Sequence, residues 1–188
     1  MGIGAIIGII ILVLVVAVIG AFISIYNGLV TVKQKVKNAW SQIEVQLQKR
    51  FDLVPNLVET VKGYAKHEKE VLDKVTELRS SWASAKSNSE KVEVENQFAG
   101  ALKTIMAVAE NYPELKANAN FMELQTQLQE IEEKIAFSRA FYNDAVTMYN
   151  TKIRVFPNNI VAGMIGYTDE ALFTVDNEEA KKNVKVEF

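Results

Sequence analysis

The beginning of the chain is apolar at every position, with no polar face. No charged side chain precedes Lys33, and the stretch from Ile3 to Ile25 is mostly Ile, Val, Leu, Ala and Gly. A helix of about 20 apolar residues crosses the hydrocarbon core of a bilayer, which is roughly 30 Å thick. The pattern therefore predicts a transmembrane helix, whose lipid-facing side chains include Ile3, Ile10, Val15, Ile19 and Ile25.

A cleaved signal peptide is the alternative interpretation of this stretch. Such a peptide has a basic segment, then a shorter apolar core and a cleavage site of small residues. Here no Lys or Arg precedes the apolar run, the run is longer, and Val18 to Ala21 makes a poor cleavage site. We therefore favour a retained membrane anchor.

The residues that follow the apolar run predict its orientation. Lys33, Lys35 and Lys37 follow it closely, and positive residues stay on the cytoplasmic side of a membrane. We expect a single pass through the cytoplasmic membrane, with the N-terminus outside and residues 27–188 inside the cell. Tyr26 falls at the headgroup level. The three lysines either contact anionic headgroups or form an ordinary solvated helix face.

Beyond the anchor, apolar residues recur at steps of three and four, which predicts long amphipathic helices. No breaker separates the anchor from the first stripe, so one helix of about 45–50 residues, ~70 Å long, is expected to continue to a break at Phe51–Pro55. The four stripes are Leu29, Val32, Val36, Ala39, Trp40, Ile43 and Leu47; Leu57, Val61, Tyr64, Val71, Val75, Leu78, Trp82 and Ala85, interrupted by Glu68; Val92, Ala99, Leu102, Met106 and Ala109; and Phe121, Leu124, Leu128, Ile131, Ile135, Tyr142, Ala145, Tyr149 and Phe156.

The joints between these stripes carry helix-boundary signals. Ser87 and Glu90 form a capping-box pattern, which predicts the start of the third helix. Pro113 predicts that the same helix stops before Asn111. After Pro157 we expect a short helix at 158–165 and a loosely held tail, with extended pieces at 173–175 or 184–186.

These elements predict an all-α protein. A transmembrane helix runs into a long antiparallel helical bundle of three to four long helices, because short loops between long helices make antiparallel neighbours. The fourth stripe has a period near 3.5, which is typical of coiled-coil packing. The predicted segments are an anchor at 1–26, the bundle at 27–157, and a short helix with an extended tail at 158–188.

Composition argues against several classes of function. The net charge is −2, with 21 basic and 23 acidic residues, so no extended basic patch indicates nucleic acid. There is no cysteine and one histidine, His67, which leaves no zinc-ligand set and no thiolate nucleophile. No phosphate-binding glycine loop, nucleophile elbow or cofactor fingerprint occurs. We predict no catalytic residue, no metal site and no cofactor.

The remaining polar and aromatic residues favour structural roles. Glu130, Glu132 and Glu133 span less than one helical turn and are expected to face water. Arg50, Asp52 and a set of asparagines are expected to cap helices or fix helix register rather than form a recognition surface. The aromatic residues are expected in the core rather than around a ligand; they are Trp40, Trp82, Phe121, Phe137, Phe141, Tyr142 and Tyr149.

Several runs of sequence resemble the LemA family. The most specific are KNAWSQIEVQL, DLVPNLVETVKGYA and FYNDAV, within segments 26–75 and 118–163. The resemblance implies a bacterial single-pass membrane protein with a cytoplasmic helical bundle and no established catalytic residues. It also implies relatives that take part in building magnetosome membranes, and others encoded near membrane quality-control metalloproteases.

Three functions are compatible with these observations. The favoured one is a non-enzymatic scaffold that self-assembles and organises or shapes the membrane. Within the span, the pairs Gly4/Gly8 and Ala17/Ala21 permit close helix contact, on faces about 220° apart. The alternative is an adaptor that presents substrates to a membrane protease or another envelope enzyme. An enzyme with carboxylate or lysine chemistry, for example around Arg50, Asp52 and His67, is the least favoured. The expected partners are the bilayer and further copies of the chain.

Overall fold

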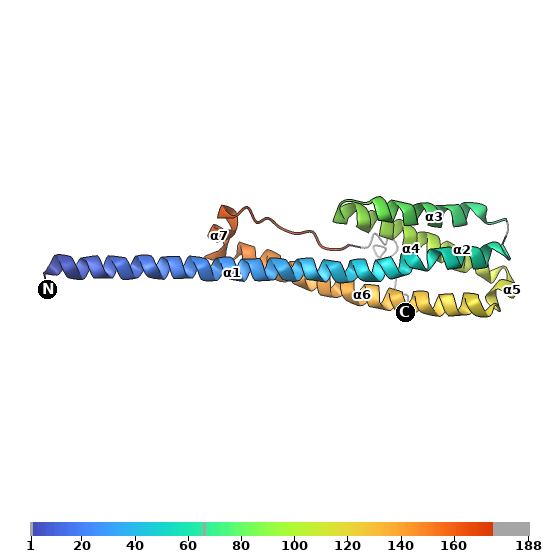
Figure 1. The fold of residues 1–188 in the computed structure, drawn as a ribbon, viewed down its shortest axis with the longest axis horizontal. Helices are drawn as coiled ribbons and strands as arrows, with labels where there is room; N and C mark the ends of the chain where they lie inside the picture. Colours follow the sequence, from blue (N-terminus) through green and yellow to red (C-terminus); the bar gives the residue numbers. More distant parts are fainter. Residues whose placement is uncertain (1, 66, 175–188) are drawn as a thin grey trace, which may run out of the picture. The chain divides into compact units, whose positions relative to one another are not determined.

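The computed structural model describes residues 2–65 and 67–174, and in that part of the chain it contains helices and no strand. The elements are labelled in Figure 1. They are α1 (Ile3–Asp52), α2 (Val54–Lys62), α3 (Lys69–Ser84), α4 (Asn88–Glu110), α5 (Pro113–Lys116), α6 (Ala119–Arg154) and α7 (Asn158–Met164). The predicted all-α class, with a long apolar first helix, is confirmed.

Helix α1 runs without interruption for 50 residues, from the apolar stretch into the amphipathic one. It contains no proline, and its predicted end is confirmed at Asp52. The next helix, α2, begins at Val54 with Pro55 in its first turn, where the missing N–H of proline costs no hydrogen bond. The start of α4 is also confirmed, because Ser87 and Glu90 form both hydrogen bonds of a capping box.

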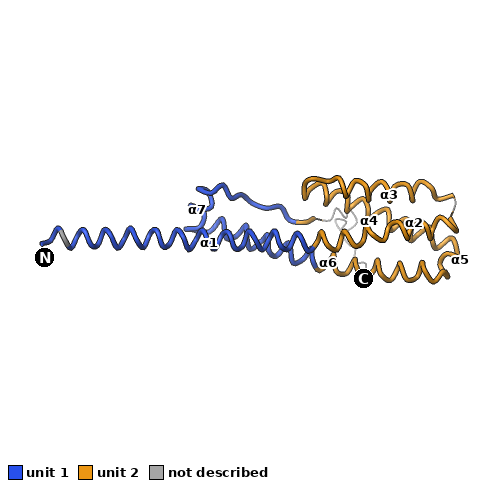
Figure 2. Tube along the Cα trace, in the orientation of Figure 1, with its two compact units in different colours: residues 1–42, 138–172 blue, residues 43–137, 173–188 orange. Residues whose placement is uncertain are grey.

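The chain divides into two compact units, drawn in different colours in Figure 2. Unit 1 comprises residues 1–42 and 138–172, and unit 2 comprises residues 43–137 and 173–188. Helices α1 and α6 contribute residues to both units.

In unit 1, α1 and α6 pair in antiparallel fashion. Trp40 lies edge-on to Tyr142 with 5.5 Å between ring centroids, and the Lys33 ammonium lies 4.8 Å from the centre of the Tyr149 ring. Each step toward the start of α1 is therefore a step toward the end of α6. The core of this pair is apolar, with Leu29 and Ala39 fully buried on α1 and Val146 fully buried on α6.

In unit 2, the end of α1 packs among α2, α3, α4 and the first half of α6. An aromatic cluster lies at the centre: the Phe51 ring stacks on Trp82 at 5.1 Å and contacts Phe98 at 4.3 Å between centroids. Phe51 and Phe98 are 1% and 0% exposed. Burying a large aromatic side chain contributes on the order of 1.5–3 kcal/mol relative to leaving it exposed, so this cluster is a main source of the unit's stability.

The helix predicted from the second stripe is two helices in the structure. α2 ends at Lys62, and α3 begins only at Lys69. Gly63 follows α2, and Ala65 closes the turn by donating its N–H to the Val61 carbonyl at 2.8 Å while being fully buried. Glycine weakens a helix by roughly 1 kcal/mol relative to alanine. Burial of the turn then decides that the chain forms two helices here instead of one. The one-turn helix α5 was not predicted.

Two further predictions are corrected. Phe137 and Phe141 are 75% and 48% exposed, so these two aromatics of α6 lie outside the core. The short helix after Pro157 is confirmed as α7, but the segment after it is not loosely held: residues 167–171 are fixed by hydrogen bonds. The predicted extended pieces at 175 and at 184–186 lie outside the described residues.

Candidate functional site

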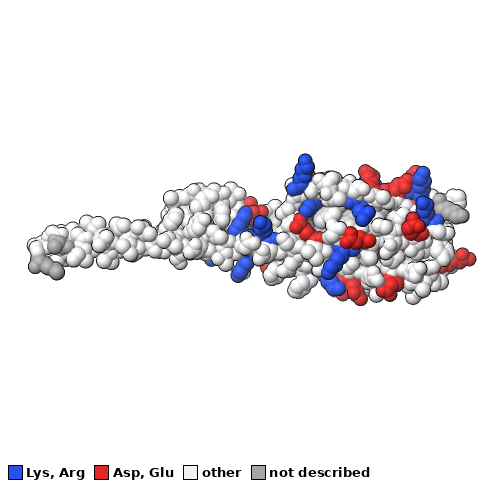
Figure 3. Space-filling model, in the orientation of Figure 1, with Lys and Arg blue, Asp and Glu red and all other residues white. Residues whose placement is uncertain are grey.

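The apolar part of α1 exposes its side chains all round. Of the five predicted anchor residues, Ile3, Ile10, Val15 and Ile19 are 79%, 53%, 49% and 53% exposed, and Ile25 is half-buried. By length and composition α1 is the one helix in the described chain that is able to cross a membrane. Figure 3 shows no charged side chain on the visible face of this stretch. Such a surface requires an apolar environment around it.

The small residues of the span also face open space. A Cβ atom added at Gly4 or Gly8 meets no atom within 4 Å, and Ala17 and Ala21 are exposed. Among residues 2–65 and 67–174, nothing therefore covers either of the two predicted contact faces. Either face can be covered by lipid or by the helix of another copy.

The three lysines after the span differ in their surroundings. Lys35 and Lys37 are exposed, whereas Lys33 forms an ion pair with Glu170 and lies over the rings of Tyr149 and Tyr167. Tyr26 is 42% exposed, at the end of the span. Lys33 is thus engaged inside unit 1, and Lys35 and Lys37 are the freely accessible cations.

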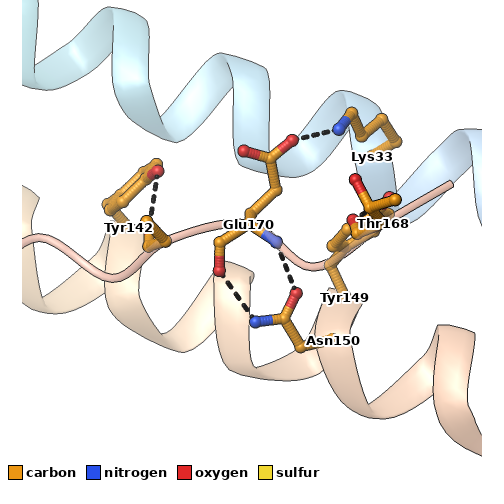
Figure 4. A network of polar contacts seen from close by, with 7 residues as sticks. Lys33, Tyr142, Tyr149, Asn150, Thr168 and Glu170 are labelled. Atoms are coloured by element: carbon orange, nitrogen blue, oxygen red, sulfur yellow. Dashed lines mark hydrogen bonds and ion pairs between the residues drawn. The ribbon is translucent and has the colours of Figure 1, made fainter. Parts of the chain in front are cut away.

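The partner of Lys33 belongs to an extended segment, residues 165–172, which we call the strap. Figure 4 shows how α6 holds it. The Asn150 side-chain amide donates to the Glu170 carbonyl, and its oxygen accepts the Glu170 N–H, both at 2.9 Å. The Tyr142 and Tyr149 hydroxyls donate to the carbonyls of Ala171 and Thr168, both at 3.1 Å. Because residues 142, 149 and 150 share one face of α6, this face of the helix holds the strap along its length.

The strap begins at a helix-ending motif. Gly166 has a φ of 71°, a left-handed conformation that glycine adopts without steric cost. Its N–H donates to the Gly163 carbonyl at 3.3 Å, and the Tyr167 N–H donates to the Ala162 carbonyl at 3.0 Å. This is the Schellman arrangement, which ends α7 and turns the chain onto α6.

The ionisable groups under the strap have shifted pKa values. Burial lowers the pKa of the Lys33 ammonium, but the hydrogen bond and charge of Glu170 raise it, and the pKa ends above its ordinary 10.5. Burial raises the pKa of Tyr142 above 10.0, and the charge of Glu170 adds to the effect. Burial also raises the pKa of Tyr149, against the opposing charge of Lys33. All three groups are therefore protonated at neutral pH and lose their protons only at alkaline pH.

Unit 2 contains a buried ion network that the stripes did not reveal. Arg50 is 1% exposed, and its guanidinium donates to Glu95, which is 0% exposed, and to Glu132. The Phe98 ring lies 5.3 Å from the Arg50 guanidinium carbon. Glu132, which we expected simply to face water, is half-exposed but paired. The network fixes the register of α1 against α4 and α6.

The described residues show no arrangement typical of catalysis. No group of three His, Cys, Asp or Glu side chains there is placed to hold a metal ion. His67 and Asp52 are exposed at the ends of helical segments. The Arg50 guanidinium is paired with the carboxylates of Glu95 and Glu132. The features that distinguish this chain are thus its apolar span, the strap held by α6 and Lys33, and a tightly paired bundle.

Comparison with known proteins identifies the family. Residues 39–188 match the family model described as the LemA family. The chain belongs to the LemA family. The matched region begins at Ala39, so it covers the bundle, α7, the strap and the residues after it, while the apolar span and the three lysines precede it.

Individual LemA-family relatives are distant in sequence. Protein LemA of Metamycoplasma hominis is 27% identical over 166 residues, which cover 86% of this chain and 76% of that protein. Magnetosome proteins MamQ 1 and MamQ 2 of Paramagnetospirillum magneticum are each 26% identical over 179 residues, covering 81% of this chain and 66% of each relative. The magnetosome protein MamQ of Magnetospirillum gryphiswaldense is 24% identical over 178 residues, covering 81% of this chain and 65% of that protein. The chain thus matches about two thirds of the length of the MamQ proteins.

Proposed function

We propose that this LemA-family protein is a non-enzymatic scaffold, anchored in the cytoplasmic membrane, that self-assembles and thereby organises or shapes the bilayer. The observation that carries the proposal is helix α1. One uninterrupted helix contains an apolar stretch exposed on all sides and, further along, side chains buried in both compact units. A helix end embedded in lipid is then covalently part of the folded protein, without a flexible linker.

The faces of the span support self-assembly. Without a hydrophobic force between helices in lipid, association relies on close packing, which small residues permit. Gly4 and Gly8 form one such face, Ala17 and Ala21 form another, and both are unobstructed. Two non-equivalent contact faces on one helix produce rings or arrays rather than isolated dimers.

An exposed apolar row on α6 gives a second basis for assembly. Phe141 and Met148 lie seven residues apart on α6 and are 48% and 53% exposed. Heptad spacing places these side chains on one side of the helix, as in a coiled-coil seam. A second copy of the chain is the occupant that this proposal assigns to the row.

Crosslinking in membranes tests the assembly. Wild-type protein treated with a short bifunctional crosslinker in native membranes should give a ladder of oligomers, and the purified protein should form regular assemblies on lipid by electron microscopy. Replacement of Gly8 by Leu should weaken the ladder, because a bulky side chain separates the helices. Val16→Leu is the control: Val16 is 61% exposed and lies roughly 80° to 140° around the helix from each of the four small residues.

The result that would overturn the scaffold proposal is a monomer under all conditions. This means a single species in detergent at every protein concentration, together with no crosslinked product in membranes. Equal effects of Gly8→Leu and Val16→Leu would remove the Gly4/Gly8 face as the contact while leaving assembly itself to be judged from the wild type.

The orientation has its own test, made possible by the absence of cysteine. Thr147, exposed on α6, can be replaced by Cys as the single thiol of the chain. Because Lys33, Lys35 and Lys37 favour a cytoplasmic position for the residues after the span, a membrane-impermeant maleimide should label the thiol only after cell lysis. Labelling in intact spheroplasts would reverse the orientation.

A further inference from the structure

The two longest uncharged stretches of the sequence come together in unit 1. The first is residues 1–32, and the second is residues 155–168, which lie between Arg154 and Asp169. The second stretch includes the bend after α6, helix α7 and the start of the strap. Figures 1 and 2 show α7 at the end of α6.

The antiparallel register places the second stretch against the end of the span. A Cβ added to Gly28 would lie 3.1 Å from the Lys152 ammonium, so these two residues face each other. Continuing the register by three and by four residues brings Val155 level with Ile25 and Phe156 level with Ser24. A span from Ile3 to Ile25 is ~34 Å long at 1.5 Å per residue, against a hydrocarbon core of roughly 30 Å. A bilayer that covers the span would therefore end near the bend after α6.

The side chains at this boundary are large, apolar and exposed. Phe156 is 79% exposed, Met164 is 71% and Ile160 is 56%, while Val161 and Ala162 of α7 are buried. We call Phe156, Ile160 and Met164 the corner residues. Single exposed apolar residues are common, but three in one short uncharged segment form a patch that indicates an interaction surface.

We propose that the corner residues insert into the headgroup layer of the same bilayer that the span crosses, as a second, interfacial contact of the chain with lipid. The proposal rests on the membrane anchor of the proposed function but not on self-assembly. The bilayer is the occupant because the antiparallel register brings the start of this segment level with the end of the lipid-facing span.

The charges around the corner fit this placement. On the side away from the span the nearest basic residues are Lys152, Arg154 and Lys33, and the acidic groups in the same region, Asp169 and Glu170, are paired with Arg154 and Lys33. Lys35 is ten residues beyond Ile25, ~15 Å along the helix. The apolar corner is thus followed by basic residues on the side away from the span, which is the order found at a membrane interface.

Environment-sensitive labels on the full-length protein test the proposal. Phe156→Cys and Met164→Cys each give a single thiol for a fluorescent label, and their exposure means that the substitutions remove little core packing. Thr147→Cys on α6 is the matched water-exposed control, and Val15→Cys is the lipid-exposed control. The proteins are reconstituted into vesicles of phosphatidylethanolamine and phosphatidylglycerol, with circular dichroism to verify helicity.

The expected result is a blue-shifted emission at 156 and 164 relative to 147. A nitroxide placed near the lipid carbonyls should quench these two labels more strongly than one placed deep in the acyl chains, and the label at 15 should show the opposite preference. Aqueous iodide should quench the label at 147 strongly and those at 156 and 164 weakly.

Two results would overturn the proposal. In one, the labels at 156 and 164 are as accessible to iodide as the label at 147. In the other, they are shielded from iodide but not quenched by lipid nitroxides, which means that another copy of the chain covers the corner. Crosslinking of the same samples separates the two proposals: oligomers with a water-exposed corner would refute only the interfacial contact, and monomers with a lipid-quenched corner would refute only the scaffold.

Discussion

Arg50 and Glu95 form an ion pair inside unit 2, where both side chains are almost completely shielded from water. They come from different helices, α1 and α4, and the guanidinium reaches a second carboxylate, Glu132, on α6. A buried pair contributes little net stability relative to apolar residues of the same size, but breaking it leaves an uncompensated charge in the core.

Removal of one partner of this pair should therefore be costly. We expect Glu95→Ala to lower the free energy of unfolding by about 3–5 kcal/mol, measured by urea denaturation of the detergent-solubilised protein. Glu77→Ala, which breaks the exposed Lys74–Glu77 pair, is the control and should cost about 0–1 kcal/mol. The double variant Arg50→Leu/Glu95→Leu should be less destabilised than Glu95→Ala. Similar losses for Glu95→Ala and Glu77→Ala would show that the pair is not buried in solution.

The strap depends on Asn150, whose amide makes two hydrogen bonds to the backbone of Glu170. In Asn150→Asp the donor is lost and a carboxylate faces the Glu170 carbonyl, at a cost of roughly 1–3 kcal/mol. Hydrogen exchange of the Glu170 amide should become about 5- to 150-fold faster. Thr147→Asp adds the same charge to an exposed position of α6 and should leave this exchange unchanged. An unchanged rate in Asn150→Asp would contradict the fixed strap.

The strap should also open at alkaline pH. The pKa values of Lys33, Tyr142 and Tyr149 are raised in the folded state above their ordinary values of 10.5 and 10.0. A raised pKa stabilises the fold below the ordinary value, and this contribution is lost as the pH rises through the folded value. Proteolysis within residues 165–172 should therefore accelerate only above about pH 10, while overall helicity is retained. Tyr142→Phe should flatten the dependence, and equal cleavage at neutral and alkaline pH would contradict it.

Two glycines should respond to alanine in opposite directions. Gly166 has a φ of 71°, so Gly166→Ala forces a side chain into the left-handed region at a cost of about 1–2 kcal/mol. Gly100 is an exposed interior residue of α4 with open space around it, and Gly100→Ala should stabilise the protein by about 0.5–1 kcal/mol. Thermal unfolding of both variants measures the two signs. A stabilising Gly166→Ala would show that the turn after α7 is not left-handed.

The sequence predicted those features that depend on neighbours along the chain. The apolar run before Lys33 defines the span, and the lack of a proline before Pro55 allows one helix from Ile3 to Asp52. Ser87 and Glu90 mark the start of α4, because both bonds of a capping box lie within four residues. The sequence runs that resemble the LemA family can also be read without a structure, and they identify the helical bundle.

Tertiary structure decided the features in which polar groups are buried or apolar ones are exposed. Leu102 and Ala109 of the third stripe are buried as predicted, but Val92, Ala99 and Met106 are only half-buried. The rest of the buried face of α4 consists of Glu95, Phe98 and Ile105. A charged residue at the start of that face hides it from a search for apolar periodicity, because Glu95 is tolerated in a core through its ion pair with Arg50, which is distant in sequence. Likewise, the sequence does not predict that Asn150 binds the backbone of Glu170, because hydrogen bonds between distant segments leave no local pattern.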